Sequence, residues 1–244
     1  MQEKGDFILK VEGLSVSFAT TAGKVHALRN VDFAVRRGET VAIVGESGSG
    51  KSVTVKTAIG ILDTNGKVEA GKALFTFKND NGEEETVDLL TLTKKQMRQT
   101  INGKRIAMVF QDPMTSLNPT MTIGDQIMEG MIWHFRTPKK EARKRAVELL
   151  DMVGITDPEK RMKNYPHQLS GGMRQRVVIA IALSCNPDLL ICDEPTTALD
   201  VTIQAKILEL IKEVQQKLGI SVIYITHDLG VVAKVADFVN IMYA

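Results

Sequence analysis

The stretch from Val41 to Ser52, VAIVGESGSGKS, constrains the fold of this chain more than any other. An apolar run rich in β-branched residues leads directly into a glycine-rich turn that ends in Lys51-Ser52. The spacing of Gly45, four residues, and then Gly50-Lys51-Ser52 is that of a phosphate-binding loop. The pattern predicts a buried strand, an anion-binding turn and a helix that begins near Ser52.

Each residue type in this loop has a physical role. Glycines let the backbone curl so that its N–H groups point at one centre, and a helix start adds positive potential there. Lys51 supplies a mobile cation for the β- and γ-phosphates, and the Ser52 hydroxyl is a ligand for Mg²⁺. A glycine turn that merely contains a lysine is disfavoured, because the helical run TVKTAIGIL follows. We expect this helix to end near Ile61.

The composition excludes several classes of protein. The chain has 244 residues, of which 43% are hydrophobic and 25% charged, as is ordinary for a globular protein. The net charge of +2 is too small to indicate a nucleic-acid binder, and no apolar run reaches the ~18–20 residues that span a bilayer. Two cysteines in apolar stretches suit buried free thiols in a reducing compartment. The N-terminal MQEKGDFILK lacks the apolar segment of a signal peptide. We therefore expect a cytoplasmic protein that reaches a membrane only through a partner.

Polar residues follow three further apolar stretches that are typical of buried strands. Gln111 follows RIAMVF, where it could reach a ligand over the sheet or simply cap the strand. Asp193 and Glu194 follow LLIC, and one carboxylate there can hold Mg²⁺ through water while the other orients or deprotonates a water. His227 follows SVIYIT, and its place at a strand end favours contact with a phosphate over a purely structural role.

A second glycine-containing helix start lies at LSGGMRQ. Ser170 is a good N-cap, Gly171 and Gly172 allow a ligand to approach the backbone, and an apolar helical run follows. Apolar and polar residues alternate from Phe7 to Ser17 and again from Val31 to Val35, which predicts two strands of an antiparallel sheet with one solvated face. Phe18, at the end of the first of these strands, suits either the core or stacking on a flat ligand such as adenine.

The sequence pattern in the middle of the chain predicts helices. The methionine-rich segment from Ile123 to Phe135 has helical spacing and suits either a core or an adaptable partner surface. A helix that begins after Thr137-Pro138 carries a basic face, which we interpret as solvated.

In combination, these motifs resemble an ABC-type ATP-binding cassette over nearly the whole chain. GESGSGKS resembles the Walker A loop, LSGGMRQ the signature motif, and LLICDE the Walker B strand with its catalytic glutamate. Gln111 resembles the Q-loop glutamine, Ala198-Leu199-Asp200 the D-loop and His227 the switch histidine. Phe18 falls where the family carries its adenine-stacking aromatic residue. No catalytic position is replaced.

The resemblance implies an α/β fold of the phosphate-loop NTPase (RecA-like) type. We expect a core with a mainly parallel sheet, an antiparallel β subdomain and an inserted α-helical subdomain. In a single nucleotide-binding domain over 1–244, residues 1–111 and 187–244 would form the ATP-binding core with the β subdomain. Residues 112–186 would form the helical subdomain.

The family's site residues transfer motif by motif. The resemblance implies catalytic roles for Glu194, His227 and Gln111, and a Mg²⁺ shell from Ser52, Gln111 and Asp193. The residues implied to bind ATP are Phe18, Gly45, Ser47, Gly48, Ser49, Gly50, Lys51, Ser52, Ser170, Gly171, Gly172 and Asp200.

VGESGSGKS, QDPMTSLNP and DEPTTALDVTIQ further resemble the ATP-binding subunits of bacterial oligopeptide and dipeptide importers, and nickel importers share much of this wording. This implies transmembrane permease subunits, a second and different cassette in a head-to-tail dimer, an extracellular solute-binding protein as an indirect partner, and a place at the cytoplasmic face of the membrane. Such subunits usually continue into a C-terminal extension, often with a cysteine cluster. We expect the extension to be absent here, which leaves its role open.

Three other functions compete with transport. Repair or condensation ATPases insert a long coiled coil before the signature, but no sustained heptads lie between Lys51 and Leu169. Translation-type proteins carry two cassettes, whereas this sequence has one. A regulatory module that binds ATP but hydrolyses it poorly is disfavoured by the intact Glu194 and His227. We expect no nucleic-acid partner.

Overall fold

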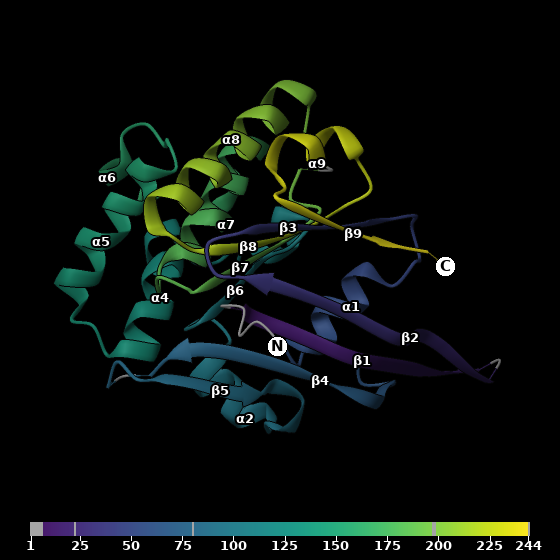
Figure 1. Cartoon of the computed structure of the whole chain (residues 1–244). Coiled ribbons are helices and arrows are strands. Elements are labelled where there is room, and N and C mark those ends of the chain that lie inside the picture. Colours follow the sequence, from purple (N-terminus) through teal and green to yellow (C-terminus); the bar gives the residue numbers. More distant parts are fainter. Residues whose placement is uncertain (1–6, 22, 80, 197–198, 244) are drawn as a thin grey trace. The chain divides into compact units, whose positions relative to one another are not determined.

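The computed structural model describes residues 7–21, 23–79, 81–196 and 199–243 (Figure 1). The chain forms two compact units. The first unit comprises residues 1–102 and 219–244, and the second comprises residues 103–218.

An antiparallel sheet in the first unit is built on a long hairpin. Its four strands lie in the order β2-β1-β4-β5, and the predicted alternation is confirmed because Leu9, Val11 and Leu14 are buried whereas Lys10 is exposed. The register places Phe18 opposite Val25 on one neighbouring strand and opposite Gly66 on the other. The strands are β1 (Phe7–Thr20), β2 (Gly23–Arg36), β4 (Gly66–Lys78) and β5 (Glu84–Asp88).

The predicted buried strand before the glycine turn is confirmed as β3 (Thr40–Gly45). It pairs in parallel with β8 (Ser221–Thr226) on one side and with β9 (Phe238–Met242) on the other. Every residue of β8 is buried, as the continuous apolar pattern requires. Helices α1 (Lys51–Ala58) and α9 (Leu229–Val235) follow β3 and β8, so the first unit contains a parallel βα arrangement.

Helix α1 is shorter than the sequence predicts. It ends at Ala58 rather than near Ile61, because Gly60 takes a φ of 70° and turns the chain back. The N–H of Gly60 donates to the carbonyl of Thr57, and that of Ile61 to Lys56. These bonds satisfy terminal carbonyls in the manner of a glycine-ended helix.

The first unit is completed by short elements between β5 and residue 102. They are the 3₁₀ turn η1 (Leu89–Thr91), α2 (Lys94–Gln96) and the π-helical turn η2 (Met97–Ile101). At the start of α2, Thr93 and Gln96 form a capping box. The turn η2 buries Met97 and Ile101, so these elements extend the core of the unit.

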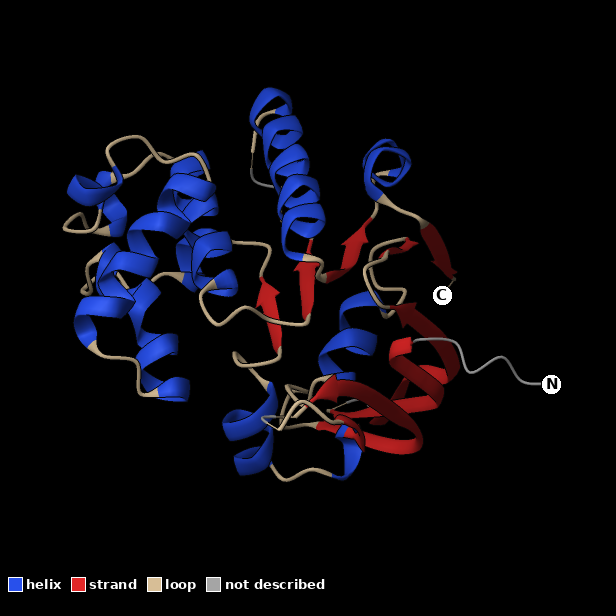
Figure 2. Cartoon of the chain, turned by 60° about the vertical axis from the view of Figure 1, so that its left-hand side comes forward, coloured by secondary structure: helices blue, strands red, loops and turns tan. Residues whose placement is uncertain are grey.

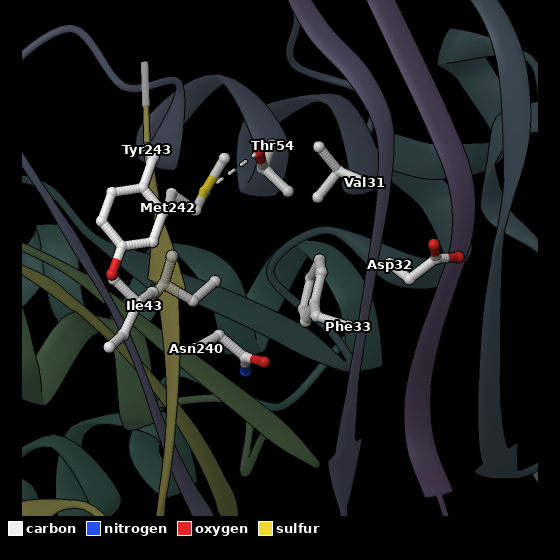
Figure 3. A pocket seen from close by; sticks show the side chains of 9 residues that line it. Val31, Asp32, Phe33, Ile43, Thr54, Asn240, Met242 and Tyr243 are labelled. Carbon is white, nitrogen blue, oxygen red and sulfur yellow. Dashed lines mark hydrogen bonds between the residues drawn. The ribbon is translucent and has the colours of Figure 1, made fainter.

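A cavity of about 270 Å³ lies in the first unit (Figure 3). Residues of β2, β3, α1 and β9 line it, and the Thr54 hydroxyl of α1 lies 3.7 Å from the Met242 sulfur of β9. Strand β9 lies at the edge of its sheet and keeps Phe238, Val239 and Ile241 exposed. The glycine turn and the first turn of α1 are therefore packed against a strand that itself remains partly open.

In the second unit, helices follow each of two parallel strands (Figure 2). Strand β6 (Ile106–Val109) pairs with β7 (Leu189–Asp193), whose residues are all buried. The helix α7 is the buried centre of this unit and contacts α3, α4, α5 and β6. The helices are α3 (Pro113–Ser116), α4 (Ile123–Phe135), α5 (Lys139–Met152), α6 (Pro158–Arg161), the 3₁₀ turn η3 (Pro166–Gln168), α7 (Gly171–Leu183) and α8 (Val201–Leu218).

Parallel strands, an antiparallel sheet and a largely helical segment confirm the α/β class. The two units are defined by contacts within the chain. The expected division is defined by function, with residues 1–111 and 187–244 as the ATP-binding core with the β subdomain and residues 112–186 as the helical subdomain. That division stays a prediction. Among the helices of the described ranges, none combines the length and apolar character needed to cross a bilayer.

Candidate functional site

The glycine-rich loop joins β3 to α1 inside the first unit. Gly48 and Gly50 have φ values of 86° and 90°, a region that glycine adopts without strain. A Cβ on Gly45 would lie 2.3 Å from the backbone oxygen of Met242, so β9 passes too close for any side chain there. The glycines therefore serve two purposes, since two of them curl the loop and one admits a neighbouring strand.

Lys51 folds back over this loop. Its ammonium donates to the carbonyls of Gly45, at 2.8 Å, and Glu46, at 2.7 Å, and the side chain is only 5% exposed. The buried Ser49 hydroxyl has no hydrogen-bond partner among the described residues. A held cation and an unsatisfied hydroxyl in a glycine-curled loop match a phosphate ligand.

His227 follows β8, next to the loop. Val44 of β3 is paired with Thr226 of β8, so Gly45 and His227 leave neighbouring parallel strands at the same edge. The next residue, Asp228, caps α9 by accepting from the N–H of Gly230 at 2.7 Å. The cap fixes the backbone that presents the exposed His227.

Phe18 lies in the antiparallel sheet of the same unit and is half-buried. A Cβ on Gly66 would lie 2.9 Å from its ring, so the ring rests against the glycine. Because the ring is half-buried, Phe18 still suits either the core or stacking on a flat ligand such as adenine.

In the second unit, Gln111 and Glu194 meet at the ends of a strand pair. Val109 of β6 is paired with Cys192 of β7, and beyond them the Gln111 amide donates to the Glu194 carboxylate at 3.1 Å. Glu194 has a φ of 46°, which costs a side-chain-bearing residue ~1–2 kcal/mol. This strained backbone holds the carboxylate beside Gln111, as strain often does at active sites.

Asp193 and the Cys192 thiol lie at the carboxyl end of β7, whereas Cys185 precedes the strand. Asp193 is 6% exposed and precedes Glu194 directly. The thiols of Cys185 and Cys192 are free and buried, as predicted. Burial raises the pKa of both thiols, and for Cys192 the charge of Asp193 raises it further. Both thiols are therefore protonated and unreactive, which leaves the carboxylates as the chemical groups at this edge.

The predicted second helix start is confirmed at α7. The Ser170 hydroxyl caps it by accepting from the N–H of Met173 at 3.4 Å, and Ser170 and Gly171 are exposed. Packing favours glycine at position 172, because a Cβ there would lie 2.9 Å from Ile203 of α8. In the same unit, Asp200 caps α8 through the N–H of Ile203 at 3.0 Å. Ala198, the first residue of the predicted D-loop, lies outside the described residues.

Comparison with known proteins decides the family. Residues 28–197 match the family model described as ABC transporter. The chain belongs to this family. It is 57% identical over 238 residues to the dipeptide transport ATP-binding protein DppD of Bacillus subtilis (strain 168), covering 97% of this chain and 68% of that protein. It is 56% identical to the oligopeptide transport ATP-binding protein OppD of the same strain, and this match covers 97% of this chain and 64% of that protein. The cassette thus spans about two thirds of the length of these relatives.

Solved structures confirm the fold of the cassette. The ATP-binding cassette MJ0796, in a dimeric post-hydrolysis state bound to ADP and Pi, matches with a TM-score of 0.79 and 30% identity over 96% of this chain and 94% of that one. CbiO1 from Clostridium perfringens, part of the transporter complex cbiONQ, matches with a TM-score of 0.77 and 34% sequence identity. The match covers 97% of this chain and 85% of that one. This ABC protein therefore has the phosphate-loop NTPase fold and is an ATPase.

Two residues of this ABC cassette lie near the predicted site residues but were not predicted. Asp228 fixes the start of α9 beside His227, and its signal was the HDLG pattern of an N-cap. Gln175 of α7 is fully buried, and neither atom of its amide has a partner within the described ranges. Its signal was its place as the last residue of the LSGGMRQ stretch.

Proposed function

We propose that this cassette hydrolyses ATP to energise the import of dipeptides or oligopeptides by a bacterial ABC transporter. The observation that carries the proposal is the identity of 57% and 56% to cassettes named for dipeptide and oligopeptide transport, over 97% of this chain. The intact motif residues support hydrolysis rather than binding alone.

The first unit would bind the nucleotide. The backbone N–H groups of Ser47 to Gly50, the Ser49 hydroxyl and Lys51 would hold the phosphates, and the adenine would stack on Phe18. Lys51 already lies against the loop carbonyls, so little reorganisation is needed for it to meet a phosphate. Pre-placed charge of this kind is the main source of catalysis in phosphoryl transfer.

The oxygen donors of Ser52, Gln111 and Asp193 would hold Mg²⁺, since hard oxygen ligands with one carboxylate suit this ion. When bound, it neutralises charge on the β- and γ-phosphates. Glu194 would polarise the attacking water and accept its proton. His227 would contact the γ-phosphate and hold Glu194 in place. Gln111, which donates to Glu194, would position that carboxylate.

The second unit would act on the nucleotide of another cassette. Ser170, Gly171 and Gly172 would present the N-terminus of α7, together with Asp200, to the ATP of a partner in a head-to-tail dimer. The partner would be a related, different chain, and both would contact transmembrane permease subunits at the cytoplasmic face of the membrane. An extracellular solute-binding protein would deliver the peptide without touching the cassette.

Uptake in the source cell tests the proposal. Glu194→Gln is introduced into the full-length gene, and uptake of labelled di- and oligopeptides is compared with uptake of labelled nickel. Loss of peptide uptake alone supports the proposal. Loss of nickel uptake alone assigns the cassette to a metal importer, and no change in either contradicts a transport role. A Glu85→Gln strain, altered at an exposed residue of β5, controls for expression.

A further inference from the structure

Exposed apolar side chains and exposed cations meet where α4 is joined to α5. Helix α4 ends at Phe135, α5 begins at Lys139, and only Arg136, Thr137 and Pro138 lie between. We call this end of the helix pair the basic tip. Its residues are Ile132, Trp133, Phe135, Arg136, Lys139, Lys140, Arg143 and Lys144, all of them exposed.

The connection that forms the basic tip is ordered by backbone hydrogen bonds. Arg136 takes a left-handed conformation with a φ of 53°, and its N–H donates to the carbonyl of Ile132. The N–H of Thr137 donates to Met131, and Pro138 then leads into α5. The tip is a fixed surface, not a disordered run of charge.

The apolar part of the basic tip is large. Trp133, the single tryptophan of the chain, is 65% exposed, and Phe135 and Ile132 are 48% and 41% exposed. The Lys104 ammonium lies 5.6 Å from the centre of the Phe135 ring, which brings a further cation to the same surface. Large apolar side chains that are exposed at one end of a helix are typical of an interaction site.

The cations of the tip include like charges that lie close together on α5. Lys139 with Arg143, and Lys140 with Lys144, are like charges one turn apart. All four occupy the N-terminal half of α5, where the helix dipole favours anions. Within the described ranges no ion pair involves these four or Arg136, whereas Arg145 pairs with Glu148. The exposed cations of the tip are therefore available to an anionic ligand.

From this surface we infer that the basic tip binds the anionic headgroup layer of a lipid bilayer. An acidic polypeptide would match the cations but not the apolar side chains beside them. A bilayer surface matches both at once, because lysine and arginine reach phosphates while tryptophan and phenylalanine enter the interface. The inference goes beyond the proposed function and does not depend on ATP hydrolysis.

Flotation of the purified full chain with lipid vesicles tests the inference. The chain is expected to float with vesicles of phosphatidylcholine and phosphatidylglycerol, to float less as salt rises, and to stay behind with phosphatidylcholine alone. Lys140→Gln with Lys144→Gln should lower the partition constant about fivefold for each removed cation. Trp133→Ala should weaken the vesicle binding that persists at high salt, and Trp133→Phe should retain that binding.

Lys94→Gln with Lys95→Gln, an exposed pair on α2, is the matched control and should float like the parent. ATPase turnover should be the same in all variants, so a failed flotation result is separable from a failed transport result. Equal flotation with neutral and anionic vesicles, or equal loss in the control pair, overturns the inference. Binding to poly-glutamate without binding to anionic vesicles also overturns it and assigns the tip to an acidic protein.

Discussion

The two glycine-containing helix starts of this chain use similar residues in different ways. In the first unit, the loop before α1 curls through glycines at φ values of 86° and 90° and carries its own buried cation, Lys51. In the second unit, the start of α7 has helical glycines and an exposed serine cap, and its nearest cation, Arg174, donates to the carbonyl of Pro166 outside the helix.

The difference indicates a division of work. A loop that carries charge, curvature and an unsatisfied hydroxyl can bind an anion without help. A capped helix start offers only N–H groups and a dipole worth a fraction of a charge, so it adds to a site that something else has formed. Phosphate binding should therefore depend mainly on the first unit, and turnover on both.

The largest expected effect separates binding from turnover at Glu194. Glu194→Gln keeps the hydrogen-bonding shape but removes the base, so ATP turnover should fall by about 10²–10⁴-fold while ATP affinity is unchanged. Steady-state ATPase and equilibrium binding, measured on the same preparation, check this. Hydrolysis at the parent rate would remove Glu194 from the catalytic role.

Lys51 provides the next largest effect, this time on binding. Lys51→Ala removes a charge-assisted contact to phosphate that is worth ~1.5–3 kcal/mol, so ATP affinity should fall by about ten- to a hundredfold. Calorimetry on the isolated chain measures it. Lys56→Ala, a basic residue in the last turn of the same helix, is the control and should bind normally. Normal affinity in the Lys51 variant would contradict the phosphate-loop assignment.

The sequence predicted the elements whose signals are local. The loop pattern, the LLIC and SVIYIT strands and the Ser170 cap each depend on neighbours in the chain, and each was found where it was expected. Their chemistry could be named for the same reason, because a strand end in an open α/β sheet is a fixed place for a ligand.

Other features depend on contacts that the sequence does not contain. Gly45 is required by Met242, almost two hundred residues away, and Gly172 by Ile203. The early end of α1 reflects one left-handed glycine, Gly60, inside a helical pattern. The hydrogen bond between Gln111 and Glu194 depends on the pairing of β6 with β7. Tertiary contact determines each of these features.

Matched glycine substitutions test the comparison through stability. Gly45→Ala places a methyl group against the Met242 carbonyl and the Ser49 hydroxyl, and overpacking of this kind costs about 1–3 kcal/mol. Gly171→Ala meets nothing closer than Leu199 at 3.9 Å in an exposed first turn, so the free energy of unfolding should not fall. Urea denaturation of both variants measures the difference. A strongly destabilised Gly171 variant would mean that this glycine has a packing role as well.

The smallest expected effect concerns Glu69, in the antiparallel sheet that carries Phe18. Hydrogen bonds from Lys24, at 2.9 Å, and from the Ser17 hydroxyl, at 2.7 Å, lower the pKa of Glu69 from 4.5 to about 2. Because the folded state holds the ionised form, the stabilisation is present above pH 4.5 and is lost as the pH falls towards 2. Glu69→Gln should thus be slightly less stable than the parent at pH 7, and the gap should close across this window. Glu85→Gln, at an exposed glutamate of the same sheet, should leave stability unchanged at both ends. A gap that stayed constant from pH 7 to pH 3 would show that Glu69 acts through packing rather than charge.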